Sequence, residues 1–232
     1  MSPDLPEQPR WLIANAILRR PGGHAIADGD GFLAVEPDRS VVFMVGRPDL
    51  VTVTKARFAT VTNGAGASPL VFVSADDIDH ARACLPDWRA ETVLLHELPE
   101  ALHTVDDSHG LELLDPDTKI DHVPDGLRPI LRTALATGPV AAAIVDGVPV
   151  SFCYPFWRSE RYWDVSVDTL EGHRGRGLGE RCVRFMASRL PGMRPILGPR
   201  ESEPRILEFC RHVGFVPVDR IYVLIDPDAP GH

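Results

Sequence analysis

Apolar and polar residues alternate along the chain with the periods typical of helices and strands, and segments of the two kinds follow one another. In the first part of the chain a helical pattern covers residues 11–19. Two β-rich runs at 32–36 and 41–45 flank a Pro-Asp-Arg-Ser turn. The same reasoning predicts helices over 50–60 and 75–84, strands over 70–73 and 92–96, and a loop over 64–69.

The second part of the chain has a more regular pattern. Spacing of i, i+3, i+4 and i+8 predicts one buried face of a helix over residues 125–136, formed by Leu127, Ile130, Leu131 and Leu135. Asp146-Gly147 is a strong signal for a two-residue hairpin turn. Further strands are predicted over 140–145, 148–154, 162–168, 195–197 and 220–225, with helices over 178–190 and 203–213. The whole order predicts an α/β protein with a mixed sheet.

A polar segment at residues 99–121, rich in Asp, Gly and Pro, separates the two parts. We therefore expect an N-terminal α/β lobe over residues 1–118 and a second lobe over 119–232. With 232 residues and 44% hydrophobic composition, the chain is long enough for such lobes to bury their own cores.

Cysteines, histidines and apolar runs limit the classes of protein to consider. The four cysteines form no CxxC pair and the histidines no HExxH motif, so we expect no metal site. Most of the cysteines have apolar neighbours, which indicates a reduced, cytoplasmic protein. No apolar run approaches the roughly 20 residues of a membrane span. The first residues lack the pattern of a secretory signal, and we expect no membrane partner.

Charge is distributed unevenly. The net charge of −9 argues against a nucleic-acid partner. Many of the arginines nevertheless fall late in the chain, at positions 174, 176, 181, 184, 189, 194, 200, 205 and 211. A local basic region in an acidic protein indicates a small phosphorylated ligand.

The strongest motif lies between the strand predicted over 162–168 and the helix predicted over 178–190. Three glycines, Gly175, Gly177 and Gly179, leave backbone N–H groups open to an anion. The helix that begins at Leu178 adds its own unpaired N–H groups and the positive end of its dipole. Two arginines, Arg174 and Arg176, add positive charge and forked hydrogen-bond donors. Together these groups would form a pyrophosphate cradle.

Other interpretations of the loop are less satisfactory. A Rossmann fingerprint would need a third glycine where Glu180 stands, and the Walker A ending GK[ST] is missing. A purely structural turn is the remaining alternative, but such a turn has no need of two arginines. The pattern left is R-x-x-G-x-G, beginning at Arg174.

This pattern resembles the signature loop of the GCN5-related N-acetyltransferases, the GNAT superfamily. The resemblance covers roughly residues 125–225 and includes the Gly-Phe pair at 214–215 before the final strand. It implies a GNAT-like acyl-CoA N-acyltransferase fold. It also implies that the N-terminal lobe is a degenerate GNAT-like half.

The resemblance further implies that acetyl-CoA binds between two splayed strands, without a metal. Backbone groups of Val165 and Val167 would contact its pantetheine arm, and an N–H near Val167 would polarise the thioester carbonyl. An amine of an unidentified acceptor, expected to be a small molecule, would attack directly. Phe156 and Trp157 could form a wall of the acceptor pocket.

The proton-transfer residues are less well defined. Possible general bases are Asp164, Asp168, Glu171 and His173, of which we favour Glu171. Family members often carry a tyrosine where Cys210 stands and an asparagine where Glu203 stands. The general acid could therefore be Cys210, Tyr222 or water, and Cys210 could instead be a buried packing residue. A CoA-binding regulatory module without turnover remains an alternative to an enzyme. The sequence does not predict the oligomeric state.

Overall fold

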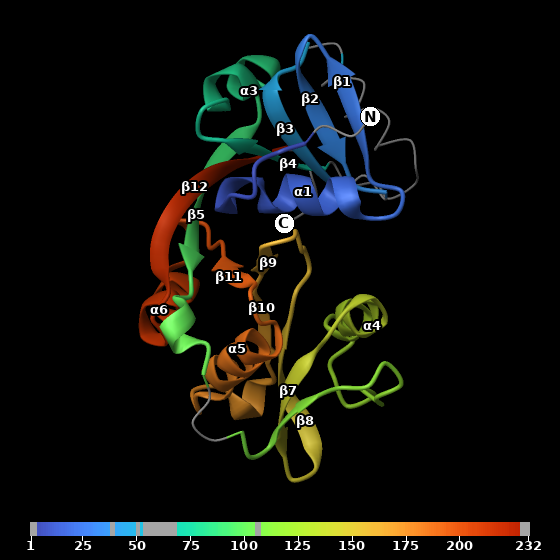
Figure 1. Cartoon of the computed structure of the whole chain (residues 1–232), viewed down its shortest axis with the longest axis vertical. Helices are drawn as coiled ribbons and strands as arrows, with labels where there is room; N and C mark the ends of the chain where they lie inside the picture. The colour runs from blue at the N-terminus through green and yellow to red at the C-terminus, as the bar shows by residue number, and fades with distance from the viewer. Residues whose placement is uncertain (1–3, 38–39, 50–51, 53–68, 105–107, 228–232) are drawn as a thin grey trace. The chain divides into compact units, whose positions relative to one another are not determined.

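The computed structural model describes residues 4–37, 40–49, 52, 69–104 and 108–227. By its internal contacts the chain forms two compact units (Figure 1). The first unit comprises residues 1–95, 198–208 and 217–232, and the second comprises residues 96–197 and 209–216. Both combine helices with strands, which confirms the predicted α/β class. The division into lobes at 1–118 and 119–232 stays a prediction.

The first unit is built on a mixed sheet with the strand order β1-β2-β3-β4-β12-β5. Neighbouring strands β3 and β4 run parallel, whereas β1–β2, β2–β3 and β4–β12 pair antiparallel. The elements are η1 (Pro9–Trp11), α1 (Leu12–Arg19), β1 (His24–Asp28), β2 (Asp30–Val35), β3 (Val41–Arg47), β4 (Leu70–Ser74), α3 (Ile78–Cys84), β5 (Arg89–Glu97) and β12 (Val216–Ile225). One core of this unit packs Leu33, Met44, Val73 and Leu224 against Ala81 and Trp88.

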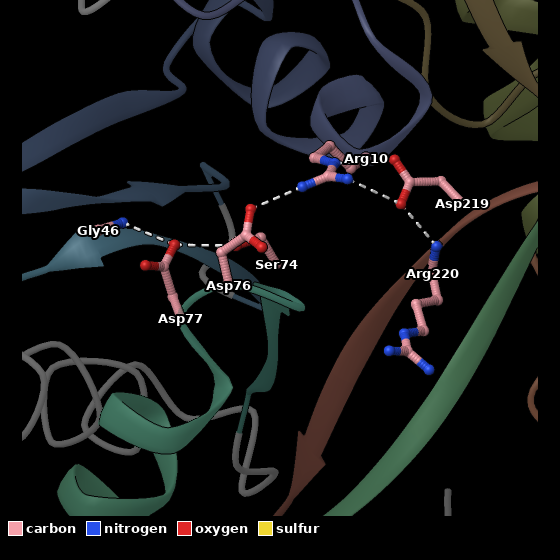
Figure 2. A network of polar contacts seen from close by, with 7 residues as sticks. All are labelled: Arg10, Gly46, Ser74, Asp76, Asp77, Asp219 and Arg220. Carbon is pink, nitrogen blue, oxygen red and sulfur yellow. Dashed lines mark hydrogen bonds and ion pairs between the residues drawn. The ribbon is translucent and has the colours of Figure 1, made fainter.

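Arg10 connects three segments of the first unit (Figure 2). Its guanidinium donates to both carboxylate oxygens of Asp219 on β12, at 2.8 and 3.1 Å, and to Asp76 at 2.7 Å. The Asp219 side chain is 15% exposed and that of Asp76 is 76% exposed. Solvent therefore screens the Asp76 pair much more strongly. The hydrogen bond to Asp219 is the main cause that raises the pKa of Arg10.

The second unit contains a four-stranded antiparallel sheet with the order β10-β8-β7-β6. Strand β9 lies outside it and pairs in parallel with β11, which also pairs antiparallel with the last two residues of β5. The elements are η2 (Glu100–Leu102), β6 (Leu111–Leu113), α4 (Arg128–Thr137), β7 (Ala141–Val145), β8 (Val148–Tyr154), β9 (Tyr162–Asp164), β10 (Ser166–Thr169), η3 (Glu171–His173), α5 (Leu178–Arg189), β11 (Arg194–Leu197) and α6 (Pro204–Val213).

Two helices cover opposite faces of this four-stranded sheet. Side chains of one face, including Ala141 and Cys153, pack with buried residues of α5. Side chains of the other face, including Phe152 and Tyr154, pack with buried residues of α4. Phe152, Cys153 and Tyr154 are consecutive, so their division between two cores follows from the alternation of side chains along a strand.

Several sequence predictions need correction. The predicted strand over 162–168 is divided into β9 and β10, which belong to different sheets. On α4, Ile130 is 43% exposed, so it does not share the buried face of Leu131 and Leu135. Strands β1 and β6 have no counterpart among the predicted elements. The helix predicted over 50–60 and the loop predicted over 64–69 lie almost entirely outside the described residues.

The order of elements occurs twice along the chain. The first half (α1 to β5) has a helix, an antiparallel hairpin, a third strand, a parallel partner, a helix and a last strand. The second half (α4 to β12) repeats this order, with β9 and β10 as the third strand and β11 as its parallel partner, and has α5 between β10 and β11. The segment of the first half between β3 and β4 lies largely outside the described residues. The last strands are exchanged: β12 pairs with β4, and the end of β5 pairs with β11.

Candidate coenzyme and catalytic site

The site is built where β9 and β10 leave their parallel partner. Strand β9 pairs with β11 from Tyr162 to Asp164, and the Val165 N–H then donates to the Ile196 carbonyl at 2.8 Å. From Ser166 onward the chain pairs with β8 instead. The strand therefore changes sheets at Val165, and the edge of β10 opposite β8 separates from β11.

The alternation of backbone groups along a strand determines which groups face this open edge. The Leu170 N–H donates to the Val150 carbonyl of β8 at 2.9 Å, so even-numbered residues of β10 direct their N–H groups toward β8. Val167 and Thr169 direct theirs the other way, toward the side on which Val165 binds β11. The Thr169 carbonyl accepts a hydrogen bond from Arg174 Nε at 3.1 Å. Val167 thus presents backbone groups at the edge, whereas the Val165 N–H is already bonded to Ile196.

The loop after β10 has two glycines in a backbone conformation that favours this residue. Gly175 and Gly177 both have φ of 72°, in the left-handed region that favours glycine. A Cβ atom on either residue would meet no atom of the protein within 4 Å, so these glycines serve backbone conformation rather than close packing. Gly179 differs, because its Cβ would lie 3.3 Å from Val167 Cγ2. The start of α5 therefore lies directly against β10.

The N-terminus of α5 is open to an anion. Gly177 is the N-cap residue and provides no side-chain cap, so the first N–H groups of the helix are left for another acceptor. Leu178 is buried and anchors the first turn in the core. Arg174 and Arg176 are both exposed beside the loop.

Two side-chain contacts adjust the charge around the loop. Arg176 Nη1 lies 3.1 Å from His173 Nδ1, and because a guanidinium can only donate, the imidazole nitrogen must accept. Glu180, in the first turn of α5, could oppose a bound anion. Its carboxylate is paired with Arg184 Nε at 3.0 Å and lies 3.2 Å from His212 Nε2. The loop, the helix end and the two arginines therefore fit a pyrophosphate group.

The residues favoured for proton transfer lie in very different surroundings. Glu171 is exposed at the start of η3. Cys210 is fully buried in the core beneath α5, and burial raises the pKa of its thiol to about 11. Tyr222 packs against the core of the first unit. These surroundings favour the interpretation of Cys210 as a packing residue, while the catalytic assignments of Glu171 and Cys210 remain predictions.

The two aspartates near β10 have distinct partners. Asp164 Oδ1 accepts hydrogen bonds from the backbone N–H groups of Phe156 and Trp157, at 2.6 and 2.5 Å. Asp164 thereby fixes the connection between β8 and β9. The Phe156 and Trp157 rings meet edge to face at 5.1 Å, and Phe156 is 38% exposed.

Asp168 accepts a hydrogen bond from the Tyr154 hydroxyl at 2.8 Å. Sequence reasoning missed this pair because its members lie on β10 and β8, and only the register of the two strands brings them together.

In the first half, a side chain of the chain itself binds the backbone just after the third strand's parallel pairing. Strand β3 pairs in parallel with β4 as far as Met44, and Gly46 follows with φ of 68°. The Gly46 N–H donates to Asp77 Oδ2 at 3.1 Å (Figure 2). The same carboxylate oxygen accepts the Ser74 hydroxyl at 2.9 Å. An internal carboxylate thus binds the backbone just beyond the end of the parallel pairing.

Within the described part of the chain, no three His, Cys, Asp or Glu side chains are grouped so that they could hold a metal ion. No described helix is long and apolar enough to cross a membrane.

Comparison with known proteins gives similarity in structure but not in sequence. No protein-family model and no curated protein matches the chain. A GCN5-related N-acetyltransferase from Kribbella flavida has a TM-score of 0.63 and 17% identity, with 95% of each chain covered. A GCN5-related N-acetyltransferase-like protein from Streptococcus suis also has a TM-score of 0.63 and 17% identity, with 96% of this chain and 94% of that chain covered. A GNAT acetyltransferase from Colwellia psychrerythraea has a TM-score of 0.56 and 13% identity, covering 95% and 90%.

Proposed function

From the fold of the GCN5-related N-acetyltransferases, which this chain has, we propose that the protein transfers an acetyl group from acetyl-CoA to a primary amine. One observation carries the proposal. The third strand of the second half leaves its parallel partner at Val165, directly beside a helix N-terminus without a side-chain cap. An open strand edge next to an anion-binding helix end suits a long ligand that joins a pyrophosphate to a flexible arm.

Each part of the loop has a role in this proposal. Backbone N–H groups between Gly175 and Gly179 bind the pyrophosphate, and Arg176 adds charge at its exposed side. Arg174 holds the loop against β10 through the Thr169 carbonyl. This part of the proposal explains why the loop contains two left-handed glycines.

The open edge of β10 has the catalytic role. Acetyl-CoA supplies the activated thioester. Backbone groups of Val167 contact its pantetheine arm, and the Val167 N–H donates to the thioester carbonyl oxygen. A donor fixed in a strand stabilises the negative charge that develops there as the amine attacks. Val165 has a structural role, because its hydrogen bond to Ile196 fixes the point at which the strand separates from β11.

We propose that the first half is a degenerate half that binds no coenzyme. The repeated order of elements supports a common architecture for the two halves. The carboxylate of Asp77 supports the absence of a ligand, because it already binds the Gly46 N–H beyond the parallel pair. A carboxylate at this point would also repel a phosphorylated ligand. The four free, buried cysteines support a cytoplasmic location.

A second candidate function is a CoA-binding regulatory module. It is favoured by the burial of Cys210, which stands where many family members carry a tyrosine. Such a module would bind acetyl-CoA without turnover.

The test is release of free CoA thiol from acetyl-CoA in the presence of a panel of primary amines: a polyamine, an aminoglycoside, free amino acids and a peptide with a free N-terminus. The proposal predicts acceptor-dependent release by the wild type and strong loss of activity in Arg176→Ala. Arg189→Ala is the matched control, because Arg189 is an exposed arginine in the last turn of the same helix. Binding of acetyl-CoA without release for any acceptor would support the regulatory module instead.

A further inference from the structure

We infer that Asp168 receives the proton of the attacking amine and that Tyr154 positions the Asp168 carboxylate. The inference rests on the proposed acetyl transfer and assigns its base. It also assigns the acceptor class, an amine that arrives as an ammonium ion and is attracted by this carboxylate.

The position of Asp168 on β10 is the first argument. Asp168 directly follows Val167, whose backbone groups face the open edge. Side chains alternate along the strand, so Val167 points toward α5 and Asp168 points to the opposite face. The face beneath α5 is filled by the core, including the close contact between Gly179 and Val167. An amine that approaches the thioester from the face opposite α5 therefore meets the Asp168 side chain.

The contacts of Asp168 are the second argument. One carboxylate oxygen, Oδ2, accepts the Tyr154 hydroxyl at 2.8 Å. Within the described part of the chain, the other oxygen has no hydrogen-bond partner. Asp168 is also partly exposed, so a ligand can reach it. A carboxylate with one oxygen fixed and one oxygen open is suited to accept a proton from a ligand.

The other acidic candidates are less suited to this role. Asp164 Oδ1 is occupied by two backbone N–H groups that fix the connection after β8. Glu171 is exposed and lies beyond the end of β10, past the residue whose carbonyl binds Arg174. Asp168, by contrast, follows Val167 directly in β10.

Tyr154 is suited to hold this carboxylate. It is 3% exposed, and its ring packs in the core beneath α4. Burial, with a smaller contribution from Asp168, raises the pKa of the Tyr154 phenol well above its usual range. The phenol therefore remains a donor to Asp168 throughout the pH range of activity. Cys153 and Asp164 are the other ionisable groups that interact with Tyr154, and the buried Cys153 thiol also stays protonated because burial raises its pKa.

Atoms and protons balance in the proposed step. The bound ammonium ion first passes one proton to Asp168. The neutral nitrogen then forms a bond to the carbonyl carbon, the bond between carbon and sulfur breaks, and the nitrogen loses a second proton to solvent. The CoA thiolate leaves and takes a proton from solvent. Asp168 later returns its proton to solvent, which restores the starting state.

The experiment compares Asp168→Asn, Asp168→Glu and Tyr154→Phe with the wild type. Two acceptors are used with acetyl-CoA: the most active amine of the panel, and hydroxylamine, which is unprotonated at neutral pH. Asp168→Asn should lose about 10²- to 10⁴-fold in kcat with the amine, the usual contribution of a general base, and far less with hydroxylamine. Its acetyl-CoA affinity should be unchanged. Asp168→Glu should recover part of the rate, and Tyr154→Phe should lower kcat while leaving the KM for acetyl-CoA unchanged.

The possible failures are distinct. If Asp168→Asn keeps the wild-type rate and pH profile, Asp168 is not the base, although acetyl transfer itself stands. An equal loss with both acceptors, together with weaker acetyl-CoA binding, would mean that Asp168 supports the site structurally. If Asp168→Asn does not fold, a wild-type kcat in both Asp168→Glu and Tyr154→Phe overturns the inference. A wild type that binds acetyl-CoA and acetylates neither acceptor overturns the inference together with the proposed enzymatic function.

Discussion

Replacing Gly177 by alanine should separate the conformational role of the loop from its binding role. Gly177 has φ of 72°, and a Cβ there would meet no protein atom within 4 Å. The cost to folding is therefore conformational alone, about 1–2 kcal/mol for a residue with a side chain in the left-handed region. For a chain of this length that corresponds to a fall in Tm of roughly 2–8 °C.

Binding should suffer more than folding in the same variant. The added methyl group projects from the N-cap of α5 into the space assigned to the pyrophosphate. Loss of one charge-assisted hydrogen bond costs about 1.5–3 kcal/mol, which corresponds to roughly ten- to hundredfold weaker binding. Titration calorimetry with acetyl-CoA, run below the Tm of the variant, measures this loss.

Gly147→Ala is the matched control. Gly147 lies in the turn between β7 and β8 with φ of 78°, and a Cβ on this residue would also meet no protein atom within 4 Å. Its substitution should lower Tm by a similar amount and leave acetyl-CoA affinity unchanged. If Gly177→Ala binds acetyl-CoA as tightly as Gly147→Ala does, the loop is a structural turn and the assignment of the cradle is refuted.

Four further outcomes are expected. Calorimetry should find one acetyl-CoA per chain, because the Asp77 carboxylate of the first half already binds the Gly46 N–H. Two sites would contradict the proposal that the first half binds no coenzyme. Arg10→Ala should lower the free energy of unfolding by about 1 kcal/mol, since it breaks a part-buried pair with Asp219, without changing acetyl-CoA affinity. Cys210→Ala should keep kcat within about threefold of the wild-type value, because Cys210 is a packing residue. A much larger loss of kcat would support Cys210 as the proton donor. The Cys210 pKa is raised from 9.0 to about 11, so the thiol stabilises the fold below pH 9 and this contribution is lost toward pH 11. Denaturation across that range should therefore show a shallower loss of stability in Cys210→Ala.

The loop and most elements could be predicted because their signals are local. Closely spaced glycines, arginines beside them and an apolar helix face are all visible within a few residues of one another. The start of α5 at Leu178 follows directly from such a pattern.

Features that depend on pairing between distant segments could not be predicted. The break at Val165 arises because neighbouring residues pair with different strands, β11 before it and β8 after it. The pair of Tyr154 and Asp168 depends on the register of β8 and β10, and the exchange of β5 and β12 on pairing across most of the chain. Periodicity also failed at Ile130, because an apolar residue at helical spacing need not be covered.

The most direct test of the central claim is the thermal stability of the purified protein with and without millimolar acetyl-CoA, measured beside Arg176→Ala. At 100 times the dissociation constant, specific binding should stabilise the wild type by about 2.7 kcal/mol. The account predicts a clear rise in Tm that is largely lost in Arg176→Ala and kept in Arg189→Ala. A folded wild type with no rise in Tm would contradict it, and the loop from Arg174 to Gly179 would then be a turn without a coenzyme.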